Sequence, residues 1–137
     1  MFRVLILIGM LWFVVGCQEK AKPVVRQSGT LQTPISCMAL NPLEGDRALM
    51  ATLKSQYAFT EDCPYKLTLS YKKDIVCNSS YNAMSKNMGK FPKSFVKLEL
   101  RRGMGVVYSY YVDLYSNVDE EDVIEGFTRL KKDLLSK

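Results

Sequence analysis

The chain has 137 residues, of which 47% are hydrophobic and 24% are charged, and its 19 basic and 14 acidic side chains give a formal net charge of +5. A chain of this length and composition is expected to form one domain with one hydrophobic core. It contains no histidine, the residue that most often serves as a general base or a metal ligand. No catalytic residue, metal site or cofactor is therefore predicted.

The first seventeen residues have the pattern of a bacterial export signal: Arg3 lies beside the amino terminus, and residues 4–15 carry no charge. The stretch before the first cysteine is shorter than the ~20 residues that a membrane-spanning helix needs. The order Val-Val-Gly-Cys at residues 14–17 resembles the lipobox of bacterial lipoproteins. This resemblance implies that residues 1–16 are cleaved, that the Cys17 sulfur receives a diacylglyceryl group, and that the new terminus is acylated with a fatty acid such as palmitate.

The residues after Cys17 indicate where the anchor is inserted. Gln18 occupies the position where some bacteria use Asp to retain a lipoprotein in the inner membrane. The resemblance therefore implies an outer-membrane anchor that faces the periplasm. Residues 18–33 lack helical or strand periodicity, so we expect a lipidated terminus and flexible tether over 17–33 and a single α+β domain over 34–137.

The first half of this domain predicts a strand, a helix and a second strand. Residues 34–40 are a short apolar run that is expected to be a strand. Asn41 is a good helix N-cap, Pro42 suits the first helical position, and apolar residues follow at helical spacing. Residues 65–71 alternate apolar and polar side chains, as a half-buried strand does, and residues 75–77 are a shorter candidate strand after a turn.

The clearest local pattern is a β-hairpin over residues 95–115. Two alternating runs flank a glycine-containing turn, and a three-residue loop at 102–104 would place Leu98 opposite Tyr108 and Leu100 opposite Val106. One face of the hairpin is then apolar. Its other face is expected to be polar, with Lys97, Glu99, Arg101, Ser109, Tyr111, Asp113 and Tyr115.

A helix is expected at the end of the chain. Asn117 is a candidate cap with Glu120 at the third helical position, and an apolar stripe follows that includes Val123, Phe127 and Leu130. The element order is therefore β-α-β-(β)-β-β-α. This order predicts an α+β fold, in which an antiparallel sheet of three to five strands carries two helices on one face.

Three cysteines remain after Cys17, namely Cys37, Cys63 and Cys77. In an oxidising periplasm a disulfide is expected, and closing the segment from Cys63 to Cys77 would stabilise the fold by ~3 kcal/mol in the loop-entropy description. This pair is preferred, and Cys37 is the competing partner. The spacings do not match those of a zinc site.

Basic residues gather between residues 86 and 102, whereas residues 113–125 are acidic. The basic residues could bind the phosphates of lipopolysaccharide, an anionic lipid surface or an acidic partner protein, or they could form a solvated surface that the acidic segment partly neutralises. Binding to nucleic acid is not expected of an exported chain. The candidate contact residues are Lys86, Lys90, Lys93, Lys97, Arg101, Arg102 and Tyr111.

These features favour a non-enzymatic periplasmic lipoprotein that acts as an accessory or adaptor subunit in assembly or maintenance of the cell envelope. Its anchor and element order are loosely similar to those of small outer-membrane assembly lipoproteins, including the lipopolysaccharide-assembly lipoprotein. That similarity implies lipopolysaccharide binding as one alternative. A surface-exposed adhesion lipoprotein and a small cell-wall hydrolase are further alternatives, and the absence of histidine weighs against the hydrolase.

Overall fold

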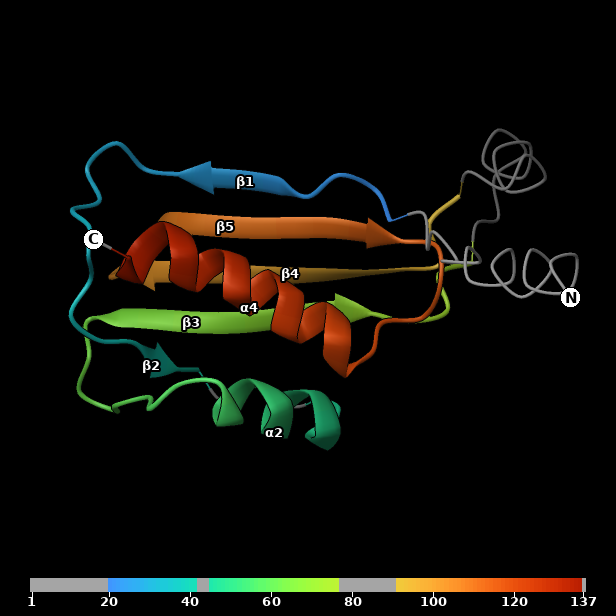
Figure 1. Ribbon diagram of the computed structural model, residues 1–137, viewed down its shortest axis with the longest axis horizontal. Helices are drawn as coiled ribbons and strands as arrows, with labels where there is room; N and C mark the ends of the chain where they lie inside the picture. The colour runs from blue at the N-terminus through green and yellow to red at the C-terminus, as the bar shows by residue number, and fades with distance from the viewer. Residues whose placement is uncertain (1–19, 42–44, 77–90, 137) are drawn as a thin grey trace, which may run out of the picture.

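A five-stranded sheet carries the helices of this protein on one face, in a computed structural model that describes residues 20–41, 45–76 and 91–136 (Figure 1). The strands lie in the order β1-β5-β4-β3-β2, and β2 is parallel to β3 while the other neighbours are antiparallel. The described elements are β1 (Val24–Gln27), β2 (Ala39–Leu40), α2 (Arg47–Ser55), β3 (Tyr65–Lys72), β4 (Ser94–Arg102), β5 (Gly105–Leu114) and α4 (Glu120–Leu135).

The predicted α+β class is confirmed, and the sheet differs from the prediction in its one parallel pair. The helix α4 crosses β4 and β5, and α2 packs against α4 near the β2 edge (Figure 1). The face under the helices supplies the apolar core. Its fully buried side chains include Leu67, Leu69, Val96, Leu98, Leu100, Tyr108, Phe127, Leu130 and Leu134.

The strand β1 lies inside the segment that was expected to be a flexible tether, so that prediction is wrong for Val24–Gln27. Val25 pairs with Tyr110 and Gln27 pairs with Tyr108, which covers the outer edge of β5. Valine suits a half-buried pleated surface, and an uncovered edge would leave backbone groups unpaired. A four-residue strand is too short for its alternation to be recognised in a charged segment.

The hairpin is confirmed, but its predicted register is wrong by two residues. Leu98 lies opposite Tyr110 and Leu100 opposite Tyr108, and a bulge follows Leu100. The turn has two central residues, Gly103 and Met104, between the paired Arg102 and Gly105. Gly103 adopts a φ of +60°, which suits the first central position of a type II′ turn. A shift of two residues keeps the side chains before the bulge on their predicted faces. The bulge, however, turns Val106 from the predicted apolar face to the polar one, where it lies opposite Arg101 and is 44% exposed.

Both helices begin later than the predicted caps. Asp46 caps α2, because its carboxylate accepts hydrogen bonds from the backbone N–H groups of Ala48 and Leu49. Asn41, the predicted cap, instead donates its backbone N–H to the Leu67 carbonyl at the sheet edge. In α4 the cap is Asp119 in a capping box with Asp122, and Asn117 lies outside the helix.

The predicted strands over 34–40 and 75–77 are reduced or absent in the described residues. Only Ala39–Leu40 pairs in the sheet, because the Ile35 N–H already donates to the Leu134 carbonyl at the end of α4. The Ile75 N–H donates to the Lys93 carbonyl without forming a strand.

The preferred disulfide between Cys63 and Cys77 is not the one observed, since Cys63 is bonded to Cys37 with the two Cα atoms 5.9 Å apart. The parallel pairing explains this choice: Ala39 lies beside Lys66, so the residues that precede both strands are also brought together. That pairing was not predicted from the sequence, and the proximity of these cysteines was therefore not recognised. Cys77 lies outside the described residues.

Candidate partner-binding face

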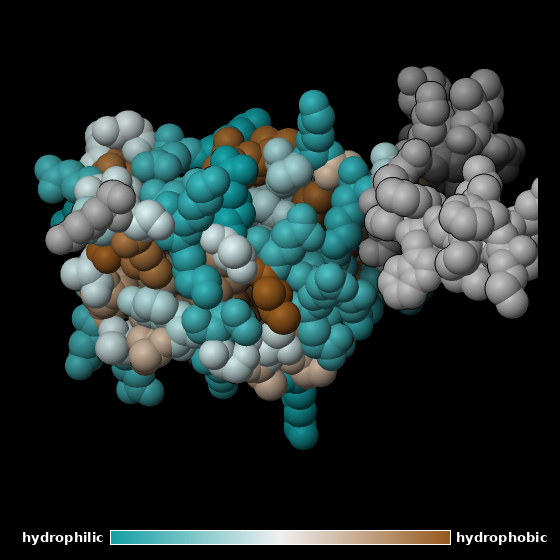
Figure 2. Space-filling view, in the orientation of Figure 1, coloured by the Kyte–Doolittle hydropathy of each residue, from teal (hydrophilic) through white to brown (hydrophobic). Residues whose placement is uncertain are grey.

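The sheet face opposite the helices is the candidate site. We call it the open face, because within residues 20–41, 45–76 and 91–136 both helices lie on the other side. Figure 2 shows that other side, where mainly hydrophilic side chains surround separate hydrophobic groups. Strand alternation assigns to the open face Arg26, Lys66, Thr68, Ser70, Lys72, Phe95, Lys97, Glu99, Arg101, Ser109, Tyr111 and Asp113.

A shallow hollow of about 820 Å³ extends over β1, β5 and β4 on this face. Apolar, aromatic and charged side chains all contribute to its walls. The hollow depends on β1, since that strand supplies one wall. Its lining includes Val24, Arg26, Phe95, Lys97, Glu99 and Tyr111.

The aromatic rings of Phe95 and Tyr111 stack on the open face, near the end of the sheet where β4 begins, with ring centroids 5.5 Å apart and ring planes inclined by 30°. The Tyr111 hydroxyl donates a 2.7 Å hydrogen bond to the Asp113 carboxylate. Burial and this hydrogen bond raise the pKa of Tyr111 to about 12. Tyr111 is therefore a neutral hydrogen-bonding aromatic residue at physiological pH.

Glu99 lies between two basic side chains on the same face. The Lys97 Nζ atom lies 2.5 Å from one Glu99 oxygen, and the Arg101 Nη2 atom lies 2.6 Å from the other. The hydrogen bond from Lys97, assisted by Arg101, lowers the pKa of Glu99 although partial burial opposes the shift. Glu99 is consequently ionised at neutral pH and neutralises part of the neighbouring positive charge.

The structure separates the predicted contact residues into different groups. Lys97, Arg101 and Tyr111 share the open face, as predicted. The Arg102 guanidinium instead lies over the Tyr65 ring, 5.6 Å from its centroid. Lys93 precedes β4, so the nine residues of that strand, ~30 Å in length, separate it from Arg102.

Lys86 and Lys90 lie outside the described residues, so their predicted contact role stays a prediction. The structure adds Arg26 and Phe95 to the candidate surface, with Lys66 beside Arg101 on the neighbouring strand. Arg26 was missed because β1 was not predicted. The alternation of the hairpin does place Phe95 on the polar face, and this signal could have identified it.

The ion pairs of Glu99 limit the reactions that side chains of the open face could catalyse. Ser109 lies directly opposite Glu99 in the β4–β5 register, the arrangement closest to a nucleophile beside a base. However, the lowered pKa of Glu99 makes this carboxylate a weak proton acceptor at neutral pH. Among the described residues, no His, Cys, Asp and Glu side chains form a cluster that could bind a metal ion.

A second hollow of about 620 Å³ lies at the opposite edge of the sheet, beside β2 and α2. Tyr57 and Phe59 give it an apolar wall, and Lys54, Glu61 and Lys66 supply its charges. The rings of Tyr57 and Phe59 also pack against Phe127 of α4. These aromatic residues therefore contribute to the core as well as to the hollow.

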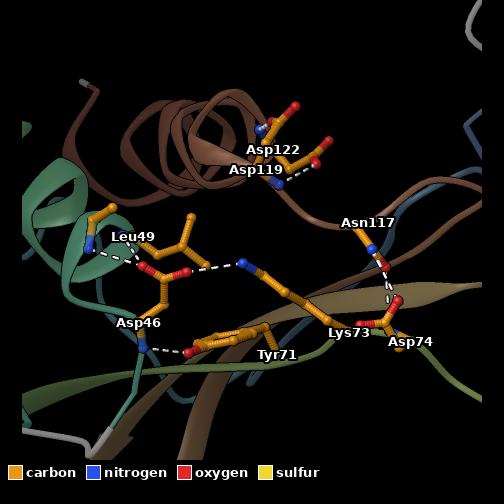
Figure 3. A network of polar contacts seen from close by, with 9 residues as sticks. Asp46, Leu49, Tyr71, Lys73, Asp74, Asn117, Asp119 and Asp122 are labelled. Carbon is orange, nitrogen blue, oxygen red and sulfur yellow. Dashed lines mark hydrogen bonds and ion pairs between the residues drawn. The ribbon is translucent and has the colours of Figure 1, made fainter.

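A polar network connects the elements at the end of the sheet where β3 and β5 finish and α4 begins (Figure 3). Lys73 binds the capping carboxylate of Asp46 at 2.8 Å. Asn117 and Asp74 exchange two hydrogen bonds, one of 3.0 Å between their side chains and one of 3.2 Å from the Asp74 backbone N–H. This network fixes the loop before α4 against the end of β3.

Lys20, which precedes β1 in the chain, binds the start of α4 at this same end of the sheet. Its Nζ atom lies 2.9 Å from Asp122 and 2.9 Å from Glu125, both on α4. Burial alone would lower the pKa of Lys20, but the hydrogen bonds to Asp122 and Glu125 outweigh it and raise that pKa above its usual value. We call this contact the Lys20 clasp.

Comparisons of the chain with models of protein families, with curated proteins and with solved structures found no match. In the described part of the chain, no helix has both the length and the apolar character of a membrane span.

Proposed function

We propose that this protein is a lipid-anchored envelope adaptor whose open face binds an acidic segment of a partner protein. The Val-Val-Gly-Cys sequence at residues 14–17 supports export and lipidation of Cys17, and an outer-membrane anchor facing the periplasm is part of the proposal. The observation that carries the binding role is the open face itself, a sheet surface with a hollow and a stacked aromatic pair.

The charge of the open face specifies the partner's chemistry. Lys66 and Arg101 lie opposite each other on adjacent strands, which places two like charges side by side. An acidic partner segment would relieve this repulsion and gain charge-assisted hydrogen bonds. The basic residues of the face are Arg26, Lys66, Lys72, Lys97 and Arg101, and the acidic ones are Glu99 and Asp113.

The aromatic pair supplies the apolar part of the proposed contact. Aromatic residues at the centre of an interface usually contribute most of its binding energy, and surrounding polar groups exclude water. Phe95 and Tyr111 are half-buried and stacked, so a partner could cover them without large rearrangement. Lys97 lies beside this pair, so an apolar contact and a basic side chain that can bind an acidic residue are next to each other.

Lipopolysaccharide is the alternative ligand for a basic surface, and the geometry favours a protein instead. Phosphate clusters are best bound by several convergent basic groups. Here Lys97 and Arg101 share Glu99, Arg102 stacks on Tyr65, and Lys93 lies at the far end of β4. These charges are distributed along a strand, which suits an extended polypeptide better than a compact phosphate group.

The proposed role is non-enzymatic. A cell-wall hydrolase would need Ser109 or another nucleophile beside an effective base, and the ion pairs of Glu99 reduce its basicity. An adhesion lipoprotein would be exposed at the cell surface, so protease treatment of intact cells would cleave it. A protein that faces the periplasm would be protected until the outer membrane is opened.

Site-specific photocrosslinking in intact cells tests the proposal. A photoreactive amino acid replaces Tyr111 on the open face or, as a matched control, the exposed Thr128 on α4. We expect an envelope protein to crosslink through an acidic segment at position 111 and not at position 128. The double change Lys97→Glu and Arg101→Glu should abolish this product, and charge reversal in the partner segment should restore it.

Several outcomes would contradict the proposed function. Equal crosslinking at both positions would indicate that the open face is not specific. A product that contains lipopolysaccharide and no protein would favour the alternative ligand. Retention of the protein crosslink after charge reversal of Lys97 and Arg101 would refute the acidic-segment mechanism.

A further inference from the structure

We infer that the Lys20 clasp fixes the orientation of the domain on the membrane, with the end that carries the start of α4 toward the lipid and the Gly103–Met104 turn away from it. The inference rests on the proposed lipidation of Cys17, and it adds which end of the domain faces the lipid. The occupant of that surface is the bilayer that carries the anchor.

The clasp restrains the chain before the first strand begins. Lys20 binds Asp122, of which only 5% is exposed, and Glu125, which is on the same side of α4 one turn later. Hydrogen bonds to charged groups contribute more than neutral ones, and Asp122 is already ordered by the capping box with Asp119. The amino-terminal end of the domain is thus bound to a rigid helix end.

The strand β1 extends this restraint along the sheet. From Val24 to Gln27 the backbone pairs with β5, so the segment that follows the clasp cannot swing away without breaking the sheet edge. Cys17 and Lys20 are separated by three Cα–Cα steps of about 3.8 Å, or at most ~11 Å. A 16-residue flexible tether would have allowed ~20 to 25 Å, with no preferred orientation.

Two exposed side chains at the clasped end can contact lipid. Figure 1 shows that β3 and β5 end there and α4 begins there, and the network of Figure 3 joins these segments. Val76 and Tyr115, which follow β3 and β5, are 70% and 40% exposed. Tyrosine favours the interface between lipid and water because its ring is apolar and its hydroxyl is polar.

The opposite end of the molecule is directed away from the bilayer in this orientation. The turn at Gly103–Met104 follows the far end of β4, a strand of nine residues that is ~30 Å long. Met104 is 95% exposed at its tip. The open face then extends alongside the membrane normal, where a partner in the same membrane could reach it from the side.

Depth-dependent fluorescence quenching tests this orientation with the full-length lipoprotein in vesicles of phosphatidylethanolamine and phosphatidylglycerol. An environment-sensitive probe is attached to Ser116→Cys at the clasped end or to Met104→Cys at the far end, in a Cys77→Ser background. Both positions are exposed, so labelling should leave the fold intact. A quencher on the lipid headgroup should strongly reduce the fluorescence of the probe at 116 and leave the probe at 104 nearly unchanged.

A clasp variant provides the second measurement. Lys20→Ala should diminish the difference between the two probes, because it removes both ion pairs with α4. Lys22→Ala is the matched control, since Lys22 is exposed and two residues further along the chain. Circular dichroism should show native secondary structure in each variant, which separates loss of orientation from loss of folding.

The two possible failures are distinguishable by flotation of the vesicles. A chain that does not float with lipid would overturn the proposed anchor and the orientation together. A chain that floats but shows equal quenching at 104 and 116, or stronger quenching at 104, would overturn the orientation and leave the anchor intact. If the difference in quenching between positions 104 and 116 is the same in the Lys20→Ala variant as in the unmodified chain, the clasp is excluded as the cause of the orientation.

Discussion

Removal of the Cys37–Cys63 disulfide should destabilise the domain by a predictable amount. The bond closes a loop of sequence separation 26, for which the loop-entropy description gives about 3.5 kcal/mol at room temperature. Cys63 is buried, so Cys37→Ser is the milder change with which to break the bond, because Cys37 is only half-buried. Cys77→Ser is the control, since it leaves the observed pair intact.

Urea unfolding of the chain from residue 18 onward, followed by circular dichroism, measures this difference. Cys37→Ser should lower the free energy of unfolding by about 3.5 kcal/mol, and a reducing agent should produce a similar loss in the unmodified chain and none in the variant. Cys77→Ser should behave like the unmodified chain. The reasoning is refuted if Cys77→Ser is the destabilised variant, because Cys63 would then pair with Cys77.

Three further changes test other parts of the structure. Lys20→Ala should lower the free energy of unfolding, measured in urea, by about 1.5 to 3 kcal/mol, because it leaves the buried Asp122 without its cation. An effect no larger than that of Lys22→Ala would contradict the clasp. Gly103→Ala should lower the free energy of unfolding by about 1 kcal/mol, because its φ is +60°. Gly105→Ala should be nearly neutral, because the added Cβ would lie 3.8 Å from the Arg102 carbonyl oxygen, an ordinary contact; equal effects would contradict the turn. The pKa of Tyr111 is raised to about 12, so this residue stabilises the folded state fully below its unfolded pKa of about 10, and the stabilisation is lost as pH rises toward 12. The free energy of unfolding should therefore fall over this pH range in the unmodified chain relative to Tyr111→Phe. Parallel pH curves for the two chains would contradict this prediction.

The elements with long amphipathic patterns were predictable from the sequence. The alternation of residues 65–71 identifies β3, and the apolar stripe through Phe127 identifies α4, because each pattern persists over several turns or strand residues. Helix starts were less predictable, since Asn41, Asp46 and other polar residues near them are all capable caps. Tertiary contacts decide between them: Tyr71 accepts a hydrogen bond from the Asp46 backbone at the start of α2.

Long-range pairing accounts for most of what the sequence did not indicate. The residues of β1 and β5 are separated by more than 80 positions, and no local pattern relates Val24 to Tyr111. The parallel contact between β2 and β3 is equally nonlocal, and the disulfide partner of Cys63 depends on it. The charge cluster between residues 86 and 102 was visible in the sequence, but among its described residues Arg102 lies apart on Tyr65, and Glu99 neutralises part of the charge of Lys97 and Arg101.

The position of β1 couples the proposed anchor to the proposed binding face. If residues 18–33 were flexible, the lipid would restrict only the distance of the domain from the membrane, and the open face could point in any direction. Because β1 forms one wall of the hollow and begins four residues after Lys20, the same short segment would complete the proposed binding face and limit its orientation. A change that detaches β1 should therefore impair partner binding even when Cys17 is lipidated and every basic residue of β3 and β4 is retained.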